Sequence, residues 1–310
     1  MTAPFTIAQL TDLHLGPIAG FELRYWGPKR AIGYVNWLRN RRDAYDEAVL
    51  ARLVADMHAQ QPDHIAVTGD LVNIGLPQEH RAALAWLHRL GAADFVTVIP
   101  GNHDIYARTG SRAPLRLWAP YMTANAGGEA YAASGDGFPF LRVLGQVALV
   151  AVNSAVPTPP AMAWGRVGRS QLKRLEQILT RLGRDGLFRL VLIHHPPLPG
   201  QAGVVRGLRD AQAVETVLVQ TGAELVIHGH NHRNMLAWRP WAGGRILVVG
   251  APSASLGRRH PHEPLARYNL YRIAGPAPWT VELIGRGLAE PGGPIVEIER
   301  RKFALRDEQK

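Results

Sequence analysis

The stretch FVTVIPGNHD, at residues 95–104, is a run of apolar and β-branched residues that ends in a loop of Gly, Asn, His and Asp. Short apolar runs bounded by Gly or Pro are typical of buried strands. Because α/β proteins carry their chemistry on the loops that leave strand ends, the polar residues of this loop are candidates for a functional site. The stretch therefore predicts a strand of an α/β sheet with chemistry at its carboxyl end.

Four further runs have the same form, each ending in side chains that can bind metal. They are FTIAQLTDLH (5–14), HIAVTGD (64–70), LVLIHHPP (190–197) and LVIHGHNH (225–232). Helical spacing of apolar residues separates several of them, which predicts helices over 44–60, 78–90, 168–182 and 210–221. This alternation favours a layered α/β sandwich, with the five strand ends at one edge.

Later runs extend the sheets. Residues 147–152, 246–249, 266–273 and 279–284 have strand character, and no long helix separates the last three, which favours a second, mixed sheet. We expect one domain over residues 1–294 and a loosely held, charged C-terminal tail over residues 295–310.

Composition limits the chemistry. The chain of 310 residues has no cysteine, which excludes disulfides and zinc–thiolate sites, so any metal must be held by nitrogen and oxygen. It has 13 His residues and a formal net charge of +10, which favours anionic partners. It has no apolar run long enough to span a bilayer and no export segment before the first strand, so we expect a cytoplasmic protein.

The spacing within the clusters suits metal ligands. Asp12 with His14, and His230 with His232, lie two residues apart, so each pair can point to the same side of an extended segment. Asp70, at a Gly-Asp turn, has two oxygens and can bridge two cations, and Asn102 adds a neutral oxygen. Two cations facing only two carboxylates leave positive charge for hydroxide and a phosphoryl group.

This donor mixture favours two manganese, iron or zinc ions. We expect attack by a metal-bound hydroxide without a covalent protein nucleophile. Next to Asn102, His103 is expected to act on the developing charge or the leaving oxygen, and Asp104 is expected to orient its ring.

In this order the five clusters resemble the five motifs of calcineurin-like metallophosphoesterases, over residues 5–232. The resemblance implies a four-layer α-β-β-α sandwich of two mixed sheets with a binuclear metal centre. It places His103 at the substrate phosphate, together with Asn102. It assigns one metal to Asp12, His14, Asp70 and His232, and the other to Asp70, Asn102, His194 and His230.

The fourth cluster allows two interpretations, because both His194-x-Pro196 and His195-x-Pro197 fit its motif. We prefer His194 as the ligand, since it directly ends the strand, and expect His195 behind it or in contact with substrate. His228 is expected to be a buried neighbour of the ligands. The six His residues outside the motifs are expected at solvated or loop positions.

An insertion at about residues 21–42 mixes six basic residues with Phe21, Tyr25, Trp26, Tyr34 and Trp37. It predicts either a lid that packs on the sandwich or a peripheral contact with the anionic inner face of a membrane. Nucleic acid is a less favoured partner.

The protein Ser/Thr phosphatases of this family carry an Arg after the Gly-Asp turn to hold the phosphate, whereas this chain has Leu71. The motifs are most similar to the bacterial branch that hydrolyses cyclic nucleotides and glycerophosphodiesters. We therefore expect a phosphodiesterase acting on a small phosphate ester. The alternatives are a membrane-associated hydrolase of a lipid-linked pyrophosphate or phosphodiester, and a metal-stabilised interaction module without turnover.

Overall fold

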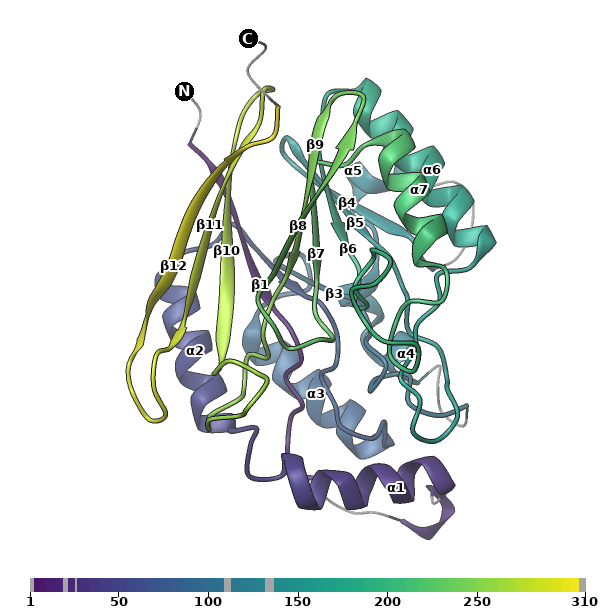
Figure 1. Ribbon diagram of the computed structural model, residues 1–310, viewed down its shortest axis with the longest axis vertical. Coiled ribbons are helices and arrows are strands. Elements are labelled where there is room, and N and C mark those ends of the chain that lie inside the picture. Colours follow the sequence, from purple (N-terminus) through teal and green to yellow (C-terminus); the bar gives the residue numbers. More distant parts are fainter. Residues whose placement is uncertain (1–2, 19–21, 26, 109–112, 132–136, 307–310) are drawn as a thin grey trace.

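Two six-stranded sheets pack face to face in the computed structural model, which describes residues 3–18, 22–25, 27–108, 113–131 and 137–306. The first sheet has the order β12-β11-β10-β1-β2-β3 and the second the order β4-β5-β6-β7-β9-β8. Helices α2 and α3 cover the outer face of the first sheet, and α6 and α7 that of the second (Figure 1). The predicted four-layer α-β-β-α sandwich of two mixed sheets is confirmed.

The strands of the first sheet are β1 (Phe5–Leu10), β2 (His64–Val67), β3 (Val96–Val98), β10 (Arg267–Ala274), β11 (Thr280–Leu288) and β12 (Ile295–Ala304). Those of the second are β4 (Phe140–Leu144), β5 (Val147–Ala151), β6 (Phe188–Leu192), β7 (Leu225–His228), β8 (Met235–Trp241) and β9 (Gly244–Gly250). The helices that cover them are α2 (Glu47–Ala59), α3 (Pro77–Leu90), α6 (Arg169–Arg184) and α7 (Ala211–Thr221). Smaller elements are α1 (Pro28–Asn36) with a π-helical turn (Trp37–Arg41), α4 (Ala113–Leu117), α5 (Ala126–Glu129) and the 3₁₀ turns Leu23–Tyr25 and Ala119–Met122.

Alternating side chains of each central strand enter two different cores. In β5, Val147 and Leu149 belong to the core between the sheets, whereas Ala148 and Val150 belong to the core beneath α6 and α7. Because both faces of the strand are buried, its sequence is apolar throughout and does not alternate between apolar and polar residues.

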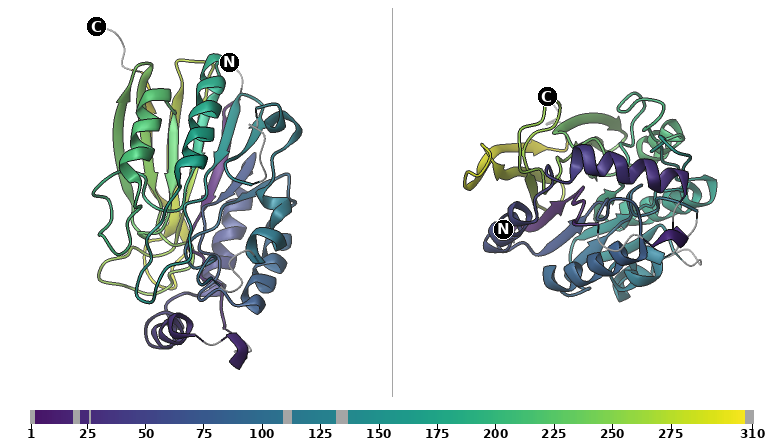
Figure 2. Two further views of the ribbon diagram at one scale, coloured as in Figure 1. Left: turned by 90° about the vertical axis from the view of Figure 1, so that its right-hand side faces the viewer. Right: turned by 90° about the horizontal axis from the view of Figure 1, so that it is seen from below.

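Parallel pairing places the motifs together. Strands β1, β2 and β3 are parallel, as are β5, β6, β7 and β9. The carboxyl ends of the two parallel sets lie at the same end of the sandwich, and α1 lies across that end (Figures 1 and 2).

The prediction of a loose tail over residues 295–310 is wrong for most of its length. Residues Ile295–Ala304 form β12, an edge strand paired antiparallel with β11. The charged side chains of this strand resemble the composition of a disordered tail because they face solvent. There Arg300 forms ion pairs with Glu297 and Glu282. Such charges protect an exposed edge from pairing with other chains. Residues 307–310 lie outside the described part.

Candidate metal centre

Side chains from all five motifs meet at the carboxyl ends of the strands. Three sets of metal-binding side chains have ligand atoms within 4.8 Å of one another. Asp70 belongs to two of these sets, as expected of a bridging carboxylate. The sets are Asp12, His14 and His232; His14, Asp70 and His103; and Asp70, His194 and His230.

Each candidate imidazole has one nitrogen held by a protein acceptor, which leaves the other nitrogen for a metal. Nδ1–H of His14 donates to the carbonyl of Val72 (3.2 Å), and Nδ1–H of His194 donates to that of Thr68 (2.8 Å). Both rings therefore present Nε2 to the cluster. Such contacts to the outer nitrogen fix the tautomer and orientation of metal-binding His residues.

The two imidazoles of the fifth motif are held in opposite senses. His230 donates from Nε2–H to the carbonyl of Arg206 (2.9 Å), and its Nδ1 lies 2.9 Å from Oδ1 of Asn102. His232 donates from Nδ1–H to Oε2 of Glu263 (2.8 Å), and its Nε2 lies 3.1 Å from Oδ1 of Asp12. Both rings thus turn their second nitrogen toward an oxygen, an arrangement that a cation between the two atoms would satisfy.

The carboxylates are oriented in the same way. Oδ2 of Asp12 accepts from the Thr11 hydroxyl (2.7 Å) and from the amide of His230 (3.0 Å), which leaves Oδ1 for the cluster. Oδ1 of Asp70 accepts from the amide of His103 (2.7 Å), and its Oδ2 lies 3.4 Å from Nε2 of His194.

Backbone strain is concentrated at these positions. Seven non-glycine residues in the described part have a positive φ, and five of them are candidate ligands. A left-handed conformation at such a residue costs about 1–3 kcal/mol and tends to occur at functional sites. The five are Asp12 (53°), His14 (45°), Asp70 (56°), His230 (68°) and His232 (52°).

Two motif glycines allow the loops to approach one another. A Cβ on Gly229 would lie 2.0 Å from Oγ1 of Thr11 and 2.4 Å from Oδ2 of Asp12. A Cβ on Gly101 would lie 2.1 Å from Oδ1 of Asp70. The glycines therefore serve loop-to-loop packing as well as turning the chain.

Burial and neighbouring charges set the protonation of the cluster. Burial lowers the pKa of His14 and of His230 well below the ordinary value, which keeps both imidazoles neutral and able to bind metal. For His194 burial acts in the same direction, but the Asp70 carboxylate outweighs it and raises the pKa to about 9. The pKa of His232 is likewise raised well above its usual value, by Tyr45 and Asp12 against the effect of burial.

This donor set fits two cations held by nitrogen and oxygen ligands. The imidazoles are oriented from outside the cluster, the carboxylate of Asp70 belongs to two of the three sets, and the facing nitrogen and oxygen atoms lie so close together that a proton or a cation must lie between them. Such a pair of ions can bind a phosphate group and activate water beside it.

His103 lies at the edge of the cluster, but Asp104 does not orient it. The Asp104 carboxylate accepts backbone N–H groups of Asp70 (2.9 Å), Leu71 (2.9 Å), Val72 (3.2 Å) and Gly101 (2.8 Å). The ring of His103 instead contacts the carbonyl of Asn73 through Nδ1. The expectation for Asp104 is therefore corrected: it holds the Gly-Asp and Gly-Asn loops together, where four amides outcompete one imidazole.

The structure places His194, not His195, at the cluster. His195 is fully buried, with Nδ1 2.8 Å from the Ser154 hydroxyl and Nε2 3.2 Å from the carbonyl of Ala163. Both nitrogens are engaged and its ring packs on that of His230, so the expected substrate contact at His195 is corrected to a supporting position.

Other His residues also differ from expectation. His228 is buried beside the cluster, with Nδ1 3.1 Å from the carbonyl of Gly229, as expected of a neighbour. The expectation of solvated positions outside the motifs is wrong for His64 and His80, which are each 1% exposed. His64 contacts Thr97 within the first sheet (2.8 Å).

Three residues at the site carry no motif that would have identified their place. Glu263 contacts His232 from a loop far along the chain, and the hydroxyl of Tyr45 lies 3.3 Å from Nδ1 of the same ring. Arg41 is one of the six basic residues of the insertion, and Nη1 of its guanidinium lies 3.0 Å from Nε2 of His103. No local pattern distinguishes it from Arg39 and Arg42.

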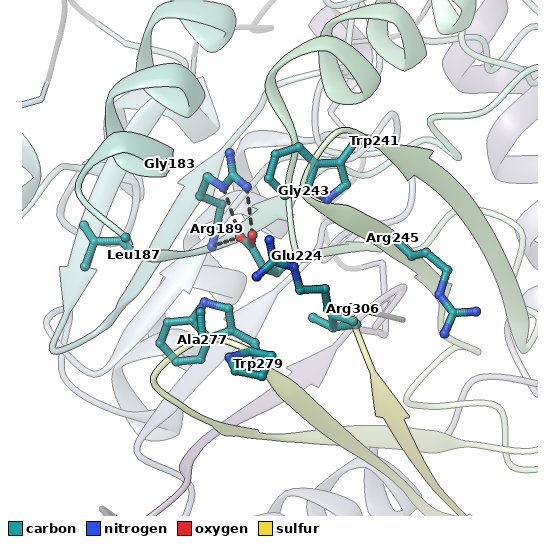
Figure 3. Close-up of a pocket in the computed structure, with 13 residues that line it drawn as sticks. Gly183, Leu187, Arg189, Glu224, Trp241, Gly243, Arg245, Ala277, Trp279 and Arg306 are labelled. Carbon is teal, nitrogen blue, oxygen red and sulfur yellow. Dashed lines mark hydrogen bonds and ion pairs between the residues drawn. The ribbon is translucent and has the colours of Figure 1, made fainter. Parts of the chain in front are cut away.

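A cavity of about 200 Å³ is lined by Leu305 and Arg306, which directly follow β12 (Figure 3). The end of β12 lies at the opposite end of the sandwich from α1 (Figure 1). The buried charge of this cavity is already balanced, because Arg189 pairs with Glu224 (2.7 Å) while its guanidinium stacks over Trp241. None of the three sets of candidate metal ligands in the described residues lines it.

Comparisons with known proteins agree with this geometry. The model of the family described as calcineurin-like phosphoesterase matches residues 5–234. A probable cyclic nucleotide phosphodiesterase of Synechococcus is 26% identical over 84% of this chain and 84% of its own length. A cAMP/cGMP dual specificity phosphodiesterase of Mycobacterium tuberculosis is 30% identical over 56% of this chain and 49% of its own.

Among solved structures, a dimetal phosphatase from Danio rerio has a TM-score of 0.62 at 16% identity, covering 98% of this chain and 100% of that one. A purple acid phosphatase from yellow lupin has a TM-score of 0.58 at 10% identity, and the match covers 99% of this chain and 55% of that one. At these identities the likeness concerns the fold.

Proposed function

The chain belongs to the calcineurin-like phosphoesterase family and is a metal-dependent phosphoric ester hydrolase, and we propose that its substrate is a cyclic nucleotide or a similar small phosphodiester. The observation that carries this proposal is the carboxylate of Asp70 shared by two sets of candidate ligands. The names of the relatives, and Leu71 in place of the Arg used by protein phosphatases, support a small diester over a phosphoprotein.

We assign the ligands as the motif order suggests. Two bound cations of the manganese, iron or zinc type would supply Lewis acidity and an activated water. One would be held by Asp12, His14, Asp70 and His232, the other by Asp70, Asn102, His194 and His230.

His103 is proposed to act on the substrate phosphate. Its Nδ1–H donates to the carbonyl of Asn73, so the proton that it exchanges with a substrate must be held at Nε2. Burial, and then the Arg41 guanidinium, lower its pKa to about 3, which keeps the ring neutral in the free protein. A phosphate at Nε2 would raise its affinity for a proton, so that it can donate to the leaving oxygen.

A substrate panel tests this proposal. Manganese-loaded protein should hydrolyse cyclic nucleotides or small glycerophosphodiesters with a higher kcat/KM than nucleotide-sugar lipids, single-stranded DNA or phosphomonoesters. A preference for monoesters would contradict the proposal, and a preference for the lipid-linked substrate would favour the second candidate.

The second candidate is a hydrolase that works at the inner face of an anionic membrane. None of the helices in the described residues is long and apolar enough to cross a bilayer. However, Ile32 (53%), Val35 (44%) and Leu38 (40%) are exposed on α1 and its π-helical turn, with exposed Arg39 and Arg42 beside them. An apolar face bordered by Arg residues suits the headgroup region of a bilayer.

The described aromatic residues Tyr34 and Trp37 do not form this face. Trp37 is only 7% exposed and stacks with Tyr34, as in the lid alternative, while Phe21 and Trp26 lie outside the described residues. Co-sedimentation with phosphatidylglycerol vesicles tests the second candidate. It should be lost in Ile32→Asp/Leu38→Asp and kept in Ile298→Asp, a control on the exposed side of β12. Equal sedimentation of all three proteins would exclude docking through α1.

A further inference from the structure

The segment that carries Arg41 is docked firmly against the loop that follows Asp70. Arg30 of α1 donates from Nε to the carbonyl of Ile74 (3.2 Å) and from Nη2 to that of Gly75 (2.9 Å). Gly33 lies so close to Tyr106 that a Cβ there would be 2.1 Å from the phenol oxygen. The helix is therefore fixed across the carboxyl ends of the strands, and the π-helical turn after it points toward the candidate metal centre.

The guanidinium of Arg41 lies beside His103, at the edge of that centre. Its Nη1 lies 3.0 Å from Nε2 of His103 and 3.4 Å from Nδ1 of the same ring. Arg41 also lines a cavity of about 400 Å³ with His14, Tyr45 and the acidic residues Asp43, Asp46 and Glu47. This cavity reaches one candidate metal ligand, His14, from the insertion.

Arg41 has no ion-pair partner among the described residues, since no carboxylate oxygen lies within 4.0 Å of its guanidinium, although its charge helps to lower the pKa of Glu263. Its hydrogen bond to the ring runs from Nη1 to Nε2 of His103 (3.0 Å), because Nδ1 of that ring holds the proton that is donated to Asn73. A guanidinium has five N–H donors in a planar fork, so most of them remain available for a ligand. A partly buried cation beside a neutral imidazole is stabilised most by an anion that reaches both groups.

We propose that Arg41 is a substrate-binding residue, whose guanidinium donates to a non-bridging oxygen of the phosphate that His103 contacts. This inference rests on the proposed function and adds to it the group that holds the phosphate. Protein phosphatases of the family carry a phosphate-binding Arg after the Gly-Asp turn, where this chain has Leu71. In this proposal Arg41, at the end of the π-helical turn of the insertion, takes the place of that Arg. On binding, the guanidinium exchanges its contact with the imidazole for a charge-assisted bond to the phosphate.

Binding of inorganic phosphate to the metal-loaded protein tests the inference without turnover. Calorimetric titration should show that Arg41→Ala weakens phosphate binding by roughly ten- to a hundredfold, the loss expected for a hydrogen bond between charged groups. Arg41→Lys should recover part of this loss, and Arg81→Ala, which removes an exposed cation of α3, should bind as wild type does. Metal content, measured in parallel, should be the same in all four proteins.

Hydrolysis of a nitrophenyl phosphodiester provides the second measurement. Arg41→Ala should lower kcat/KM, and added guanidinium ion should restore part of the loss. Unchanged phosphate affinity in Arg41→Ala would overturn the inference even if wild type is fully active. Conversely, wild type that binds phosphate through Arg41 but hydrolyses no diester would overturn the proposed function and leave the inference standing.

Discussion

The Nε2 atoms of His14 and His232 lie 3.4 Å apart, although the two residues are separated by 218 positions in the chain. Each ring donates its Nδ1–H away from the cluster, so the two Nε2 atoms face one another. Two lone pairs at this distance repel unless a proton or a cation lies between them. The metal centre therefore depends on competition between protons and metal ions.

Metal affinity should increase with pH. In the metal-free protein the pKa of His194 is raised to about 9 and that of His232 is raised well above its usual value, so both rings hold protons at neutral pH. A cation must displace these protons, so its apparent affinity should rise about tenfold per pH unit for each proton displaced, and should level off once the pH exceeds both values. Calorimetric titration with Mn²⁺ from about pH 6 upward checks this. His194→Gln should show a smaller slope, and an affinity independent of pH would contradict the assignment.

Asp70 and His103 should have separable roles. Asp70→Ala removes the carboxylate that belongs to two of the three sets of candidate ligands, so it should lose metal and activity together. His103→Ala should keep both metals and lose about 10²–10⁴-fold in kcat, the usual contribution of a general acid. Elemental analysis alongside kinetics distinguishes the two variants. Loss of metal from His103→Ala would mean that this ring, which belongs to one ligand set, binds a cation.

Glu263 should support metal binding without touching metal or substrate. It accepts the Nδ1–H of His232 at 2.8 Å and so holds the ring with Nε2 toward Asp12. Loss of such an outer contact typically costs 10–100-fold in metal affinity, which is the effect we expect for Glu263→Ala. Glu290→Ala, at an exposed position in a turn, is the control and should bind Mn²⁺ as wild type does. Equal Mn²⁺ affinities in the two variants would show that Glu263 does not support metal binding.

Gly229 should tolerate no side chain. A Cβ there would lie 2.0 Å from Oγ1 of Thr11, and relief of that clash must move the fifth motif away from the first. We expect Gly229→Ala to lose metal and to be destabilised by about 1–3 kcal/mol, as for other overpacked sites. Gly203→Ala, which has open space around its Cβ position, should keep both properties in metal analysis and thermal unfolding. A Gly229→Ala protein with full metal content would show that the loops have room to separate.

The strands and helices that carry the motifs could be predicted from the chain alone. The run before Asp12 is β1, and the apolar spacing of residues 78–90 is α3, which begins one residue earlier at Pro77. These predictions succeed because the periodicity of buried side chains is a local property. β12 was missed for the same reason, since an edge strand with charged faces has no apolar period to detect.

Local periodicity does not predict the contacts between polar groups. Asp104 follows His103 directly, yet it binds amides of two loops, and the imidazole is held by the carbonyl of Asn73 instead. Likewise, nothing local distinguishes Arg41 from Arg39 and Arg42, although only Arg41 contacts His103.

The order and spacing of the motif residues by themselves determined the family, the sandwich and the identity of the candidate ligands, because metal chemistry demands particular donor atoms. Tertiary structure alone decided that His194 rather than His195 faces the cluster, and that Arg41 and Glu263 reach the site at all. The physical reason is that a hydrogen bond or a ligand contact depends on the direction of a side chain in space, and here that direction is set by packing between segments that lie far apart along the chain.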